Sequence, residues 1–176
     1  MQYSADETLD LLLDGKVRII QRRDGYRVSE DALHLCRFVK SMPEEVGIDL
    51  GAGCGIVAIV LAVERKVAGM VGLEIQESLA AIAARNVRIN GLGGRVKIVA
   101  GDIRRVEELF DPQEAMLVVS NPPYRELGRG RLSPAAEKRT AKHEWSCSLE
   151  DLVEAADYLL APDGVFAFCH LRERWD

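Results

Sequence analysis

The sequence IDLGAGCGI, residues 48–56, joins an apolar strand pattern to a helix pattern through three closely spaced glycines. Gly51, Gly53 and Gly55 permit backbone angles and close approaches that a side chain would prevent. The stretch therefore predicts a strand over 46–50, then a glycine loop, then a helix that begins near Gly55.

The loop departs from the dinucleotide-binding pattern GxGxxG in two ways. Its sixth position is Ile56 rather than glycine, and Asp49 opens the loop. A carboxylate there would repel a diphosphate and would suit a ligand that carries positive charge. A nicotinamide-dependent oxidoreductase is disfavoured for these two reasons.

Strand and helix patterns alternate along the rest of the chain. We expect strands over 46–50, 70–74, 96–99, 115–120 and 165–169, and helices that begin near Gly55, Ser78, Arg104 and Ser148. Such βαβα alternation predicts an α/β fold, with a doubly wound, mostly parallel sheet that has helices on both faces. We expect a single domain over 1–176, with the sheet and its helices in 46–176.

We expect residues 1–45 to form a smaller N-terminal unit, made of a helix and a hairpin, that acts as a lid over the ligand site. An acidic, helical start is followed by two extended runs around Asp24-Gly25, which is a hairpin signal. Ser29 predicts the N-cap of a helix that ends before Pro43. One face of that helix is apolar: Ala32, Leu35, Cys36 and Val39.

Composition is consistent with one globular domain, because 48% of the 176 residues are hydrophobic. No apolar run reaches the roughly 18 residues of a membrane span, and the acidic N-terminus lacks a signal-peptide pattern. We therefore expect a cytoplasmic protein without a membrane partner. The four cysteines are widely spaced and no histidines cluster, so neither a disulfide framework nor a metal site is expected.

The net charge of −5 argues against indiscriminate binding to nucleic acid, but two segments are basic. Residues 15–27 hold five cations and one aspartate, a balance of +4, and residues 121–145 hold six cations and three glutamates, a balance of +3. The stretch 125–146 is also the longest without clear periodicity. Long irregular segments in compact domains are usually functional or disordered.

Acidic residues follow the second and third strands of the predicted sheet. Glu74 ends the second strand, where its carboxylate can accept both hydroxyls of a ribose. Asp102 follows the third strand, beside Ile103, and can accept a hydrogen bond from an adenine amino group. Together with Asp49, these carboxylates stand at three successive carboxyl strand ends, which predicts a ligand site there.

The fourth strand ends abruptly in VVSNPPY, residues 118–124. Pro122 and Pro123 supply no ladder donors and bias the residues before them towards extended backbone, so they stop the strand rigidly. Asn121 and Tyr124 are therefore held stiffly at the carboxyl end of the strand, where open parallel sheets bind ligands.

Taken together, DLGAGCG, Glu74, Gly101-Asp102 and NPPY resemble the class I S-adenosylmethionine-dependent methyltransferases that act on planar nitrogen. A finer resemblance is to bacterial tRNA adenine-N6 methyltransferases, which modify the adenine just 3′ of the anticodon of a valine tRNA. It is carried by DGYRVSEDALHL, NPPYRELGRGRLSP, RTAKHE and HLRERW, and it covers nearly the whole chain. The resemblance implies a Rossmann-like sheet and a methyl transfer from S-adenosylmethionine to tRNA, with S-adenosylhomocysteine as product and no metal.

The resemblance also implies roles for individual residues. The Asn121 side-chain oxygen and the Pro122 carbonyl would accept the two N–H groups of the adenine amine, Pro123 would stiffen the kink, and Tyr124 would stack on the base. The residues expected to bind the cofactor are Asp49, Gly51, Ala52, Gly53, Gly55, Glu74, Ile75, Asp102, Ile103 and Asn121. The residues expected to clamp RNA are Arg125, Arg129, Arg131, Lys138, Arg139, Lys142 and His143.

In one respect the sequence departs from the class I pattern. That sheet usually has two strands beyond the fifth, whereas this chain stops seven residues after the strand expected at 165–169. The apolar edge of that strand would be an aggregation liability, and pairing with a second copy of the chain would cover it. The N-terminal hairpin is expected to add a second cationic contact to RNA.

Two other functions stay open. The NPPY motif also occurs in methyltransferases that act on a glutamine side-chain amide of release factors, and both acceptors are planar nitrogens. The shortened sheet favours a catalytically idle module that binds cofactor or RNA, although the complete NPPY quartet argues against it.

Overall fold

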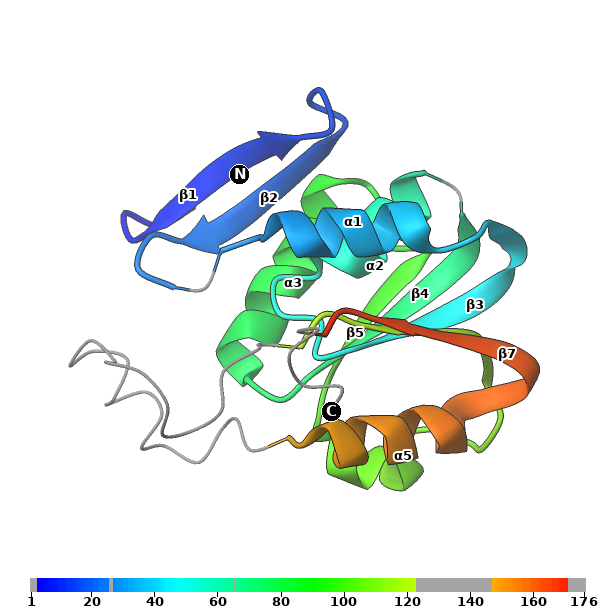
Figure 1. Cartoon of the computed structure of the whole chain (residues 1–176). Coiled ribbons are helices and arrows are strands. Elements are labelled where there is room, and N and C mark those ends of the chain that lie inside the picture. The colour runs from blue at the N-terminus through cyan, green and yellow to red at the C-terminus, as the bar shows by residue number, and fades with distance from the viewer. Residues whose placement is uncertain (1–2, 26, 65, 123–146, 171–176) are drawn as a thin grey trace.

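The computed structural model describes residues 3–25, 27–64, 66–122 and 147–170. Its elements in chain order are β1 (Glu7–Leu12), β2 (Val17–Arg22), α1 (Glu30–Phe38), β3 (Met42–Leu50), α2 (Ile56–Val63), β4 (Val67–Glu74), α3 (Glu77–Ile89), β5 (Val96–Ala100), the 3-10 helix η1 (Ile103–Glu108), β6 (Ala115–Ser120), α5 (Leu149–Leu159) and β7 (Leu160–Phe168). Helices α1, α2 and α3 lie on one side of a central sheet and α5 and η1 on the other, while β1 and β2 form a separate hairpin (Figure 1).

The central sheet is parallel, with strand order β5-β4-β3-β6-β7. The chain moves outwards from β3 through β4 to β5, and then returns to β6 on the other side of β3. The order therefore reverses between β3 and β6, and open sheets bind ligands at such a switch point, outside the carboxyl ends of the strands. The predicted doubly wound α/β fold is confirmed.

Both faces of the sheet are buried, as the apolar strand patterns predicted. On β6, Leu117 and Val119 belong to the core shared with α1 and α2, whereas Val118 belongs to the core shared with α5. This alternation follows from the two-residue period of a strand. Just beyond Ser120, Asn121 and Pro122 are half-buried.

Most of the predicted elements are present, with shifts at their ends. The strand at 115–120 and the helix capped by Ser29 have the expected bounds, and the Ser29 side chain accepts a hydrogen bond from the N–H of Ala32. Strand β3 begins at Met42, so Pro43 lies inside a strand instead of marking only a helix end. The segment expected to be a helix near Arg104 is a 3-10 helix.

The prediction for the start of the chain is wrong in two respects. Residues Glu7–Leu12 form strand β1 rather than a helix, and β1 pairs antiparallel with β2. The hairpin turn lies at Leu13, Asp14 and Gly15, whose φ angles of 51°, 54° and 82° are all left-handed, and not at Asp24-Gly25. Aspartate followed by glycine favours such a turn, so the chain carried this signal twice and the first one forms the hairpin.

The hairpin is fastened to helix α3. The Arg85 guanidinium donates two hydrogen bonds to the Glu7 carboxylate, at 2.7 and 3.0 Å. This pair lowers the pKa of Glu7 from 4.5 to about 2, even though burial of the carboxyl opposes the shift. This ion pair therefore helps to dock the hairpin against the helical layer.

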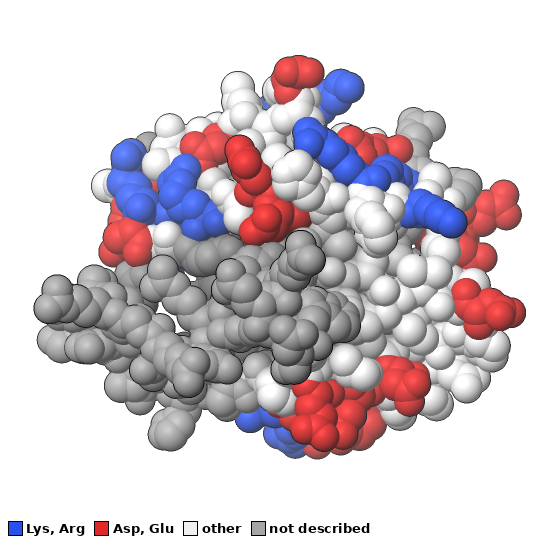
Figure 2. Space-filling view, viewed as in Figure 1, with Lys and Arg blue, Asp and Glu red and all other residues white. Residues whose placement is uncertain are grey.

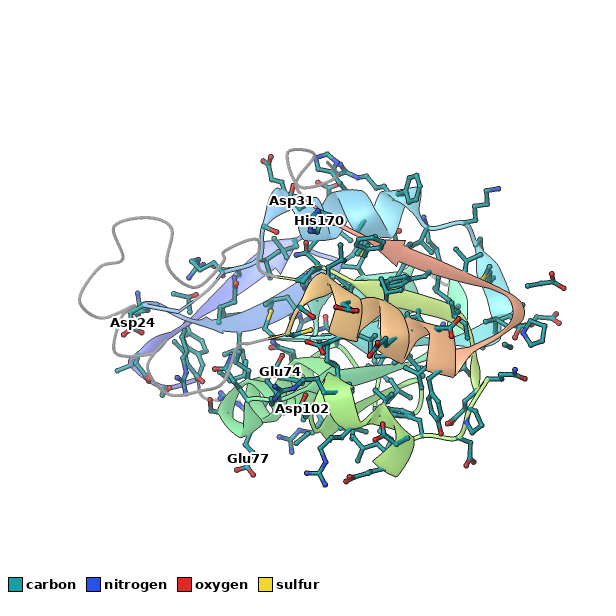
Figure 3. The ribbon with its side chains drawn as sticks, turned by 60° about the horizontal axis from the view of Figure 1, so that its bottom comes forward. Asp24, Asp31, Glu74, Glu77, Asp102 and His170 are labelled. Atoms are coloured by element: carbon teal, nitrogen blue, oxygen red, sulfur yellow. The ribbon has the colours of Figure 1, made fainter. Side chains whose placement is uncertain are left out.

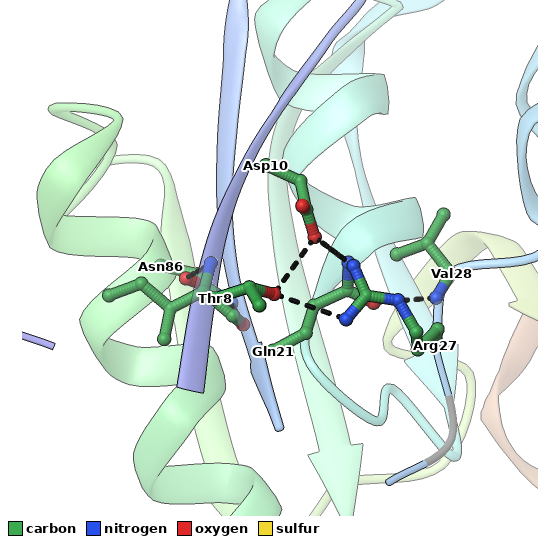
Figure 4. A network of polar contacts seen from close by, with 7 residues as sticks. Thr8, Asp10, Gln21, Arg27, Val28 and Asn86 are labelled. Carbon is green, nitrogen blue, oxygen red and sulfur yellow. Dashed lines mark hydrogen bonds and ion pairs between the residues drawn. The ribbon is translucent and has the colours of Figure 1, made fainter. Parts of the chain in front are cut away.

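A polar network links the hairpin to the segment that leads into α1 (Figure 4). The Arg27 guanidinium donates to the side chains of Thr8 and Asp10, and the side-chain oxygen of Gln21 accepts a hydrogen bond from the Val28 N–H. Arg27 is therefore engaged inside the N-terminal unit. The contact to RNA expected of the N-terminal hairpin stays a prediction.

Strand β7 ends the sheet order, and Val165 on it is 43% exposed. The pairing of 165–169 with a second copy stays a prediction. Within the described ranges, no helix is both long enough and apolar enough to cross a membrane.

Candidate functional site

The glycine loop runs from the end of β3 into α2 and is anchored to the neighbouring strand. The N–H groups of Gly51 and Ala52 both donate to the Leu73 carbonyl, at 2.9 Å each. Gly55 is the N-cap of α2, with a φ angle of 84°, and an added Cβ there would lie 3.2 Å from the Ala83 Cβ. Gly55 therefore serves close packing of the loop against α3.

Gly51 and Gly53 serve a different purpose. Their φ angles are 75° and 57°, and a Cβ added at either position would meet nothing within 4 Å. The loop thus presents bare backbone to open space on its outer side. A ligand can approach the backbone there as closely as glycine allows.

Glu74 lies directly beside this loop, at the end of β4, and its side chain is fully buried. One carboxylate oxygen accepts the Gly53 N–H at 2.8 Å, and the other accepts the Gln76 N–H at 2.9 Å. Burial raises the pKa of Glu74, and the two backbone donors oppose that rise. The carboxylate therefore joins the end of β4 to the glycine loop.

Asp49 lies beneath the loop and is only 1% exposed. Its carboxylate accepts the Ala58 N–H of α2 at 3.3 Å. Burial, with a smaller contribution from the neighbouring charge of Glu74, raises the pKa of Asp49 from 3.8 to about 7, and the hydrogen bond from Ala58 opposes this rise. Two buried carboxylates close to bare loop backbone form an acidic floor that suits a cationic ligand better than an anionic one.

Asp102 lies near Glu74, at the ends of the adjacent strands β5 and β4 (Figure 3). The Gly101 N–H donates to the Glu74 carbonyl at 3.0 Å, which fixes this neighbourhood. The Asp102 carboxylate caps η1 by accepting the Arg104 N–H, and it also pairs with the Arg104 guanidinium. The hydrogen bond from the guanidinium lowers the pKa of Asp102. Ile103 follows as the first residue of η1.

Asn121 leaves β6 at the switch point. Strands β3 and β6 are paired in parallel, with Asp49 opposite Val119. The two strands therefore reach Gly51 and Asn121 at the same edge of the sheet. The Ser120 hydroxyl donates to the Leu50 carbonyl at 2.7 Å, which ties the two strand ends together. The structure thus brings the glycine loop and the start of NPPY side by side, as the sequence predicted.

The remaining predicted site residues divide into two groups. Pro122 and Ile75 are half-buried beside the residues above. Outside the described residues lie Pro123, Tyr124, Arg125, Arg129, Arg131, Lys138, Arg139, Lys142 and His143. Figure 2 shows basic and acidic side chains interspersed on the described part of one face, which presents no continuous basic surface there.

Two residues near the site were not predicted. Ser29 was expected only as a cap, but its hydroxyl also accepts a hydrogen bond from the Asn121 side-chain amide at 3.4 Å. Asn86 on α3 donates to the Cys54 carbonyl of the glycine loop at 2.9 Å. An asparagine among the buried alanine and valine positions of α3 was the available signal.

A family model described as "Methyltransferase small domain" matches residues 32–170, which is most of the chain. The chain belongs to the methyltransferase small domain family. Its matched part includes the glycine loop, all five strands of the sheet and the NPPY segment.

Curated proteins that are similar to the chain include tRNA methyltransferases. The chain is 34% identical over 119 residues to a tRNA1(Val) (adenine(37)-N6)-methyltransferase of Bacteroides fragilis, which corresponds to 68% of this chain and 49% of that protein. It is 33% identical over 136 residues to the enzyme of the same name from Porphyromonas gingivalis, over 76% of this chain and 52% of that protein. The chain thus spans about half the length of these relatives.

Solved structures share the fold of this methyltransferase domain. Pyrococcus horikoshii TYW2 in complex with MeSAdo superposes with a TM-score of 0.67 and 13% identity, over 95% of this chain and 53% of that one. TrmN from Thermus thermophilus superposes with a TM-score of 0.60 and 21% identity, over 81% of this chain and 38% of that one. At these identities the likeness concerns the fold alone.

Proposed function

We propose that this methyltransferase domain transfers a methyl group from S-adenosylmethionine to the exocyclic N6 of an adenine in tRNA, the adenine 3′ of the anticodon. The observation that carries the proposal is the register between β3 and β6, with Asp49 opposite Val119, which sets Asn121 beside the glycine loop. The curated relatives support the tRNA acceptor.

The residues around the loop fit S-adenosylmethionine. Bare backbone at Gly51 and Gly53 gives room for a close ligand. Asp49 would suit its cationic groups, and Glu74 would accept its ribose hydroxyls. Asp102 would accept a hydrogen bond from the adenine amino group beside Ile103, and Gly55, Ala52 and Ile75 would line the cofactor. The cofactor supplies an electrophilic methyl group on a positively charged sulfur.

The chain's own contribution to the chemistry is to position the acceptor. The lone pair of an adenine amine is delocalised into the ring, so the amine is a weak nucleophile. Acceptance of its two N–H groups by the Asn121 side-chain oxygen and the Pro122 carbonyl would favour a pyramidal nitrogen and direct its lone pair at the methyl group. The nitrogen gains the methyl group, the sulfur takes the electrons of the broken bond, and the surplus proton leaves to water. This is catalysis by orientation and electrostatics.

RNA capture would fall to residues beyond Pro122. Tyr124 would stack on the flipped base, which is worth about 1–3 kcal/mol, and the cationic residues between 125 and 143 would meet phosphates. Residues 1–45, with the hairpin and α1, would cover the site. A tRNA substrate would place the protein in the cytoplasm.

The test is incubation of the protein with labelled S-adenosylmethionine and total tRNA, followed by nucleoside analysis. N6-methyladenosine in the tRNA is the expected product. Label on a glutamine of an added release factor would show that the acceptor is a protein amide instead of tRNA. Cofactor binding without methyl transfer to tRNA or to the release factor would identify a catalytically idle module. Charge reversal at both Arg129 and Arg131 should weaken tRNA binding, and unchanged RNA affinity would remove the clamp from the proposal.

A further inference from the structure

Asn86 is a fully buried side chain that contacts two separate parts of the molecule. Its Oδ1 accepts the Ile20 N–H at 2.7 Å, and its Nδ2 donates to the Ile20 carbonyl at 3.0 Å. The same Nδ2 donates to the Cys54 carbonyl at 2.9 Å. One side-chain amide thus hydrogen-bonds to the backbone of Ile20 in strand β2 on one side and of Cys54 in the glycine loop on the other.

Asn90 repeats the first half of this arrangement one helical turn later. Its side chain accepts the Arg18 N–H at 2.9 Å and donates to the Arg18 carbonyl at 2.7 Å. Four residues of helix advance about 6 Å, close to the roughly 6.6 Å of two strand residues, so the two asparagines pair with Arg18 and Ile20 as a neighbouring strand would. Asn90, however, has no hydrogen bond to the glycine loop among the described contacts.

We propose that Asn86 is a positioning residue that couples the docking of the N-terminal hairpin to the shape of the glycine loop. The inference rests on the proposed cofactor, because the loop's shape matters through the ligand that it binds. Gly53 is held from within the sheet by Glu74, and Cys54, the next residue, is held from α3 by Asn86. The loop is therefore fixed from two sides, and the hairpin lies directly behind one of them.

This coupling gives the hairpin a part in cofactor binding that does not require it to touch the cofactor. When Ile20 leaves α3, both hydrogen bonds between Ile20 and Asn86 are lost and the amide is free to rotate away from Cys54. The half-buried Cys54 carbonyl would lose its donor, which costs free energy, so the loop would shift to recover a partner. Docked and undocked hairpins would then correspond to tighter and weaker cofactor binding.

The matched pair Asn86→Ala and Asn90→Ala tests this proposal. Both variants remove two hydrogen bonds to β2, but only Asn86→Ala removes the bond to Cys54. Titration calorimetry with S-adenosylhomocysteine should show affinity weakened about tenfold in Asn86→Ala and less than about twofold in Asn90→Ala. In turnover assays, Asn86→Ala should raise the KM for S-adenosylmethionine and leave kcat nearly unchanged, whereas mere partial unfolding would lower kcat at constant KM.

Equal losses of affinity in the two variants would show that hairpin docking acts on the cofactor site without Asn86. That result would overturn this inference and leave the proposed function standing. Failure of the wild-type chain to bind S-adenosylhomocysteine would refute both the cofactor and the inference. If Asn86→Ala does not fold, amide hydrogen exchange on the wild-type protein tests whether hairpin docking is coupled to cofactor binding. Saturating S-adenosylhomocysteine should slow exchange of the Ile20 N–H, about tenfold, and an unchanged rate would overturn the coupling.

Discussion

The hydroxyl oxygen of Ser29 accepts a hydrogen bond from the side-chain amide of Asn121, at 3.4 Å, and also one from the Ala32 N–H. One side chain therefore begins helix α1 and contacts the first residue of NPPY. Because the Nδ2 of Asn121 is directed towards Ser29, its Oδ1 lies on the other side of the amide group. The N-terminal unit thus helps to set the orientation that the proposed chemistry requires.

Ser29→Ala should lower both stability and turnover. Loss of the cap should cost about 1 kcal/mol, and loss of the contact to Asn121 should lower kcat beyond the fraction of protein unfolded. Ser148→Ala is a matched control, because Ser148 caps α5 through the Asp151 N–H and lies on another element. Urea unfolding and initial rates on both variants would check this, and equal kcat values per folded molecule would argue against the orienting role.

Asn121→Ala should damage turnover far more than cofactor binding. Removal of an oxygen that stabilises the reacting amine should lower kcat about 100-fold. Calorimetry with S-adenosylhomocysteine should give nearly the wild-type affinity. A parallel loss in affinity and in kcat would mean that Asn121 mainly holds the cofactor.

Gly53→Ala should weaken cofactor binding without a large loss of stability. The positive φ angle makes alanine strained there by about 1 kcal/mol, and the added methyl group would occupy the space in front of the loop. Gly91→Ala is the control, because Gly91 has a φ angle of 69° and equally open surroundings at the end of α3. Both variants should lose similar stability on thermal unfolding. Only Gly53→Ala should weaken the binding of S-adenosylmethionine measured by calorimetry. Equal affinities of the two variants for the cofactor would mean that it binds away from Gly53.

Asp49→Asn should stabilise the fold at high pH. The pKa of Asp49 is about 7 in the fold, above its usual value of 3.8, so ionisation costs free energy and stability falls as the pH rises through that window. The variant should therefore exceed the wild type by about 1–4 kcal/mol near pH 8 and by little near pH 4. Urea unfolding at the two pH values measures this. A constant difference would mean that the carboxylate ionises normally.

The pair of Glu7 and Arg85 should give the opposite pH dependence. The pKa of Glu7 is lowered from 4.5 to about 2, so its contribution is fully present above about pH 4.5 and is lost as the pH falls towards 2. Glu7→Gln should be less stable than the wild type by about 2 kcal/mol near neutral pH, and the two should converge near pH 2. Denaturant titrations along the pH range would reveal any failure to converge.

The sequence alone predicts the central sheet well, because its signals are local. The apolar run that ends at Ser120, the three glycines after Leu50 and the cap at Ser29 each specify one element without help from distant residues. Parallel pairing then brings the carboxyl strand ends together by topology, so the meeting of Asn121 with the glycine loop could be predicted as well.

The N-terminal unit was predicted less well, because its structure depends on partners far along the chain. The leucine-rich acidic start was compatible with a helix, and only pairing with β2 makes it a strand. The contacts of Asn86 with Ile20 and Cys54 join residues 66 and 32 positions apart. No local pattern reports such contacts, although a polar residue at a core position of α3 indicated that one was needed.

The pairing of Asn86 and Asn90 with one strand edge also restricts how this region can change length. Each residue of a helix turns by about 100° around its axis, so one inserted or deleted residue between the two asparagines would swing one amide away from β2. Substitutions on the exposed side of α3 leave this alignment intact, whereas a single-residue indel would break the pairing of one asparagine with β2. The spacing of four is thus a constraint as strict as the identity of the two side chains.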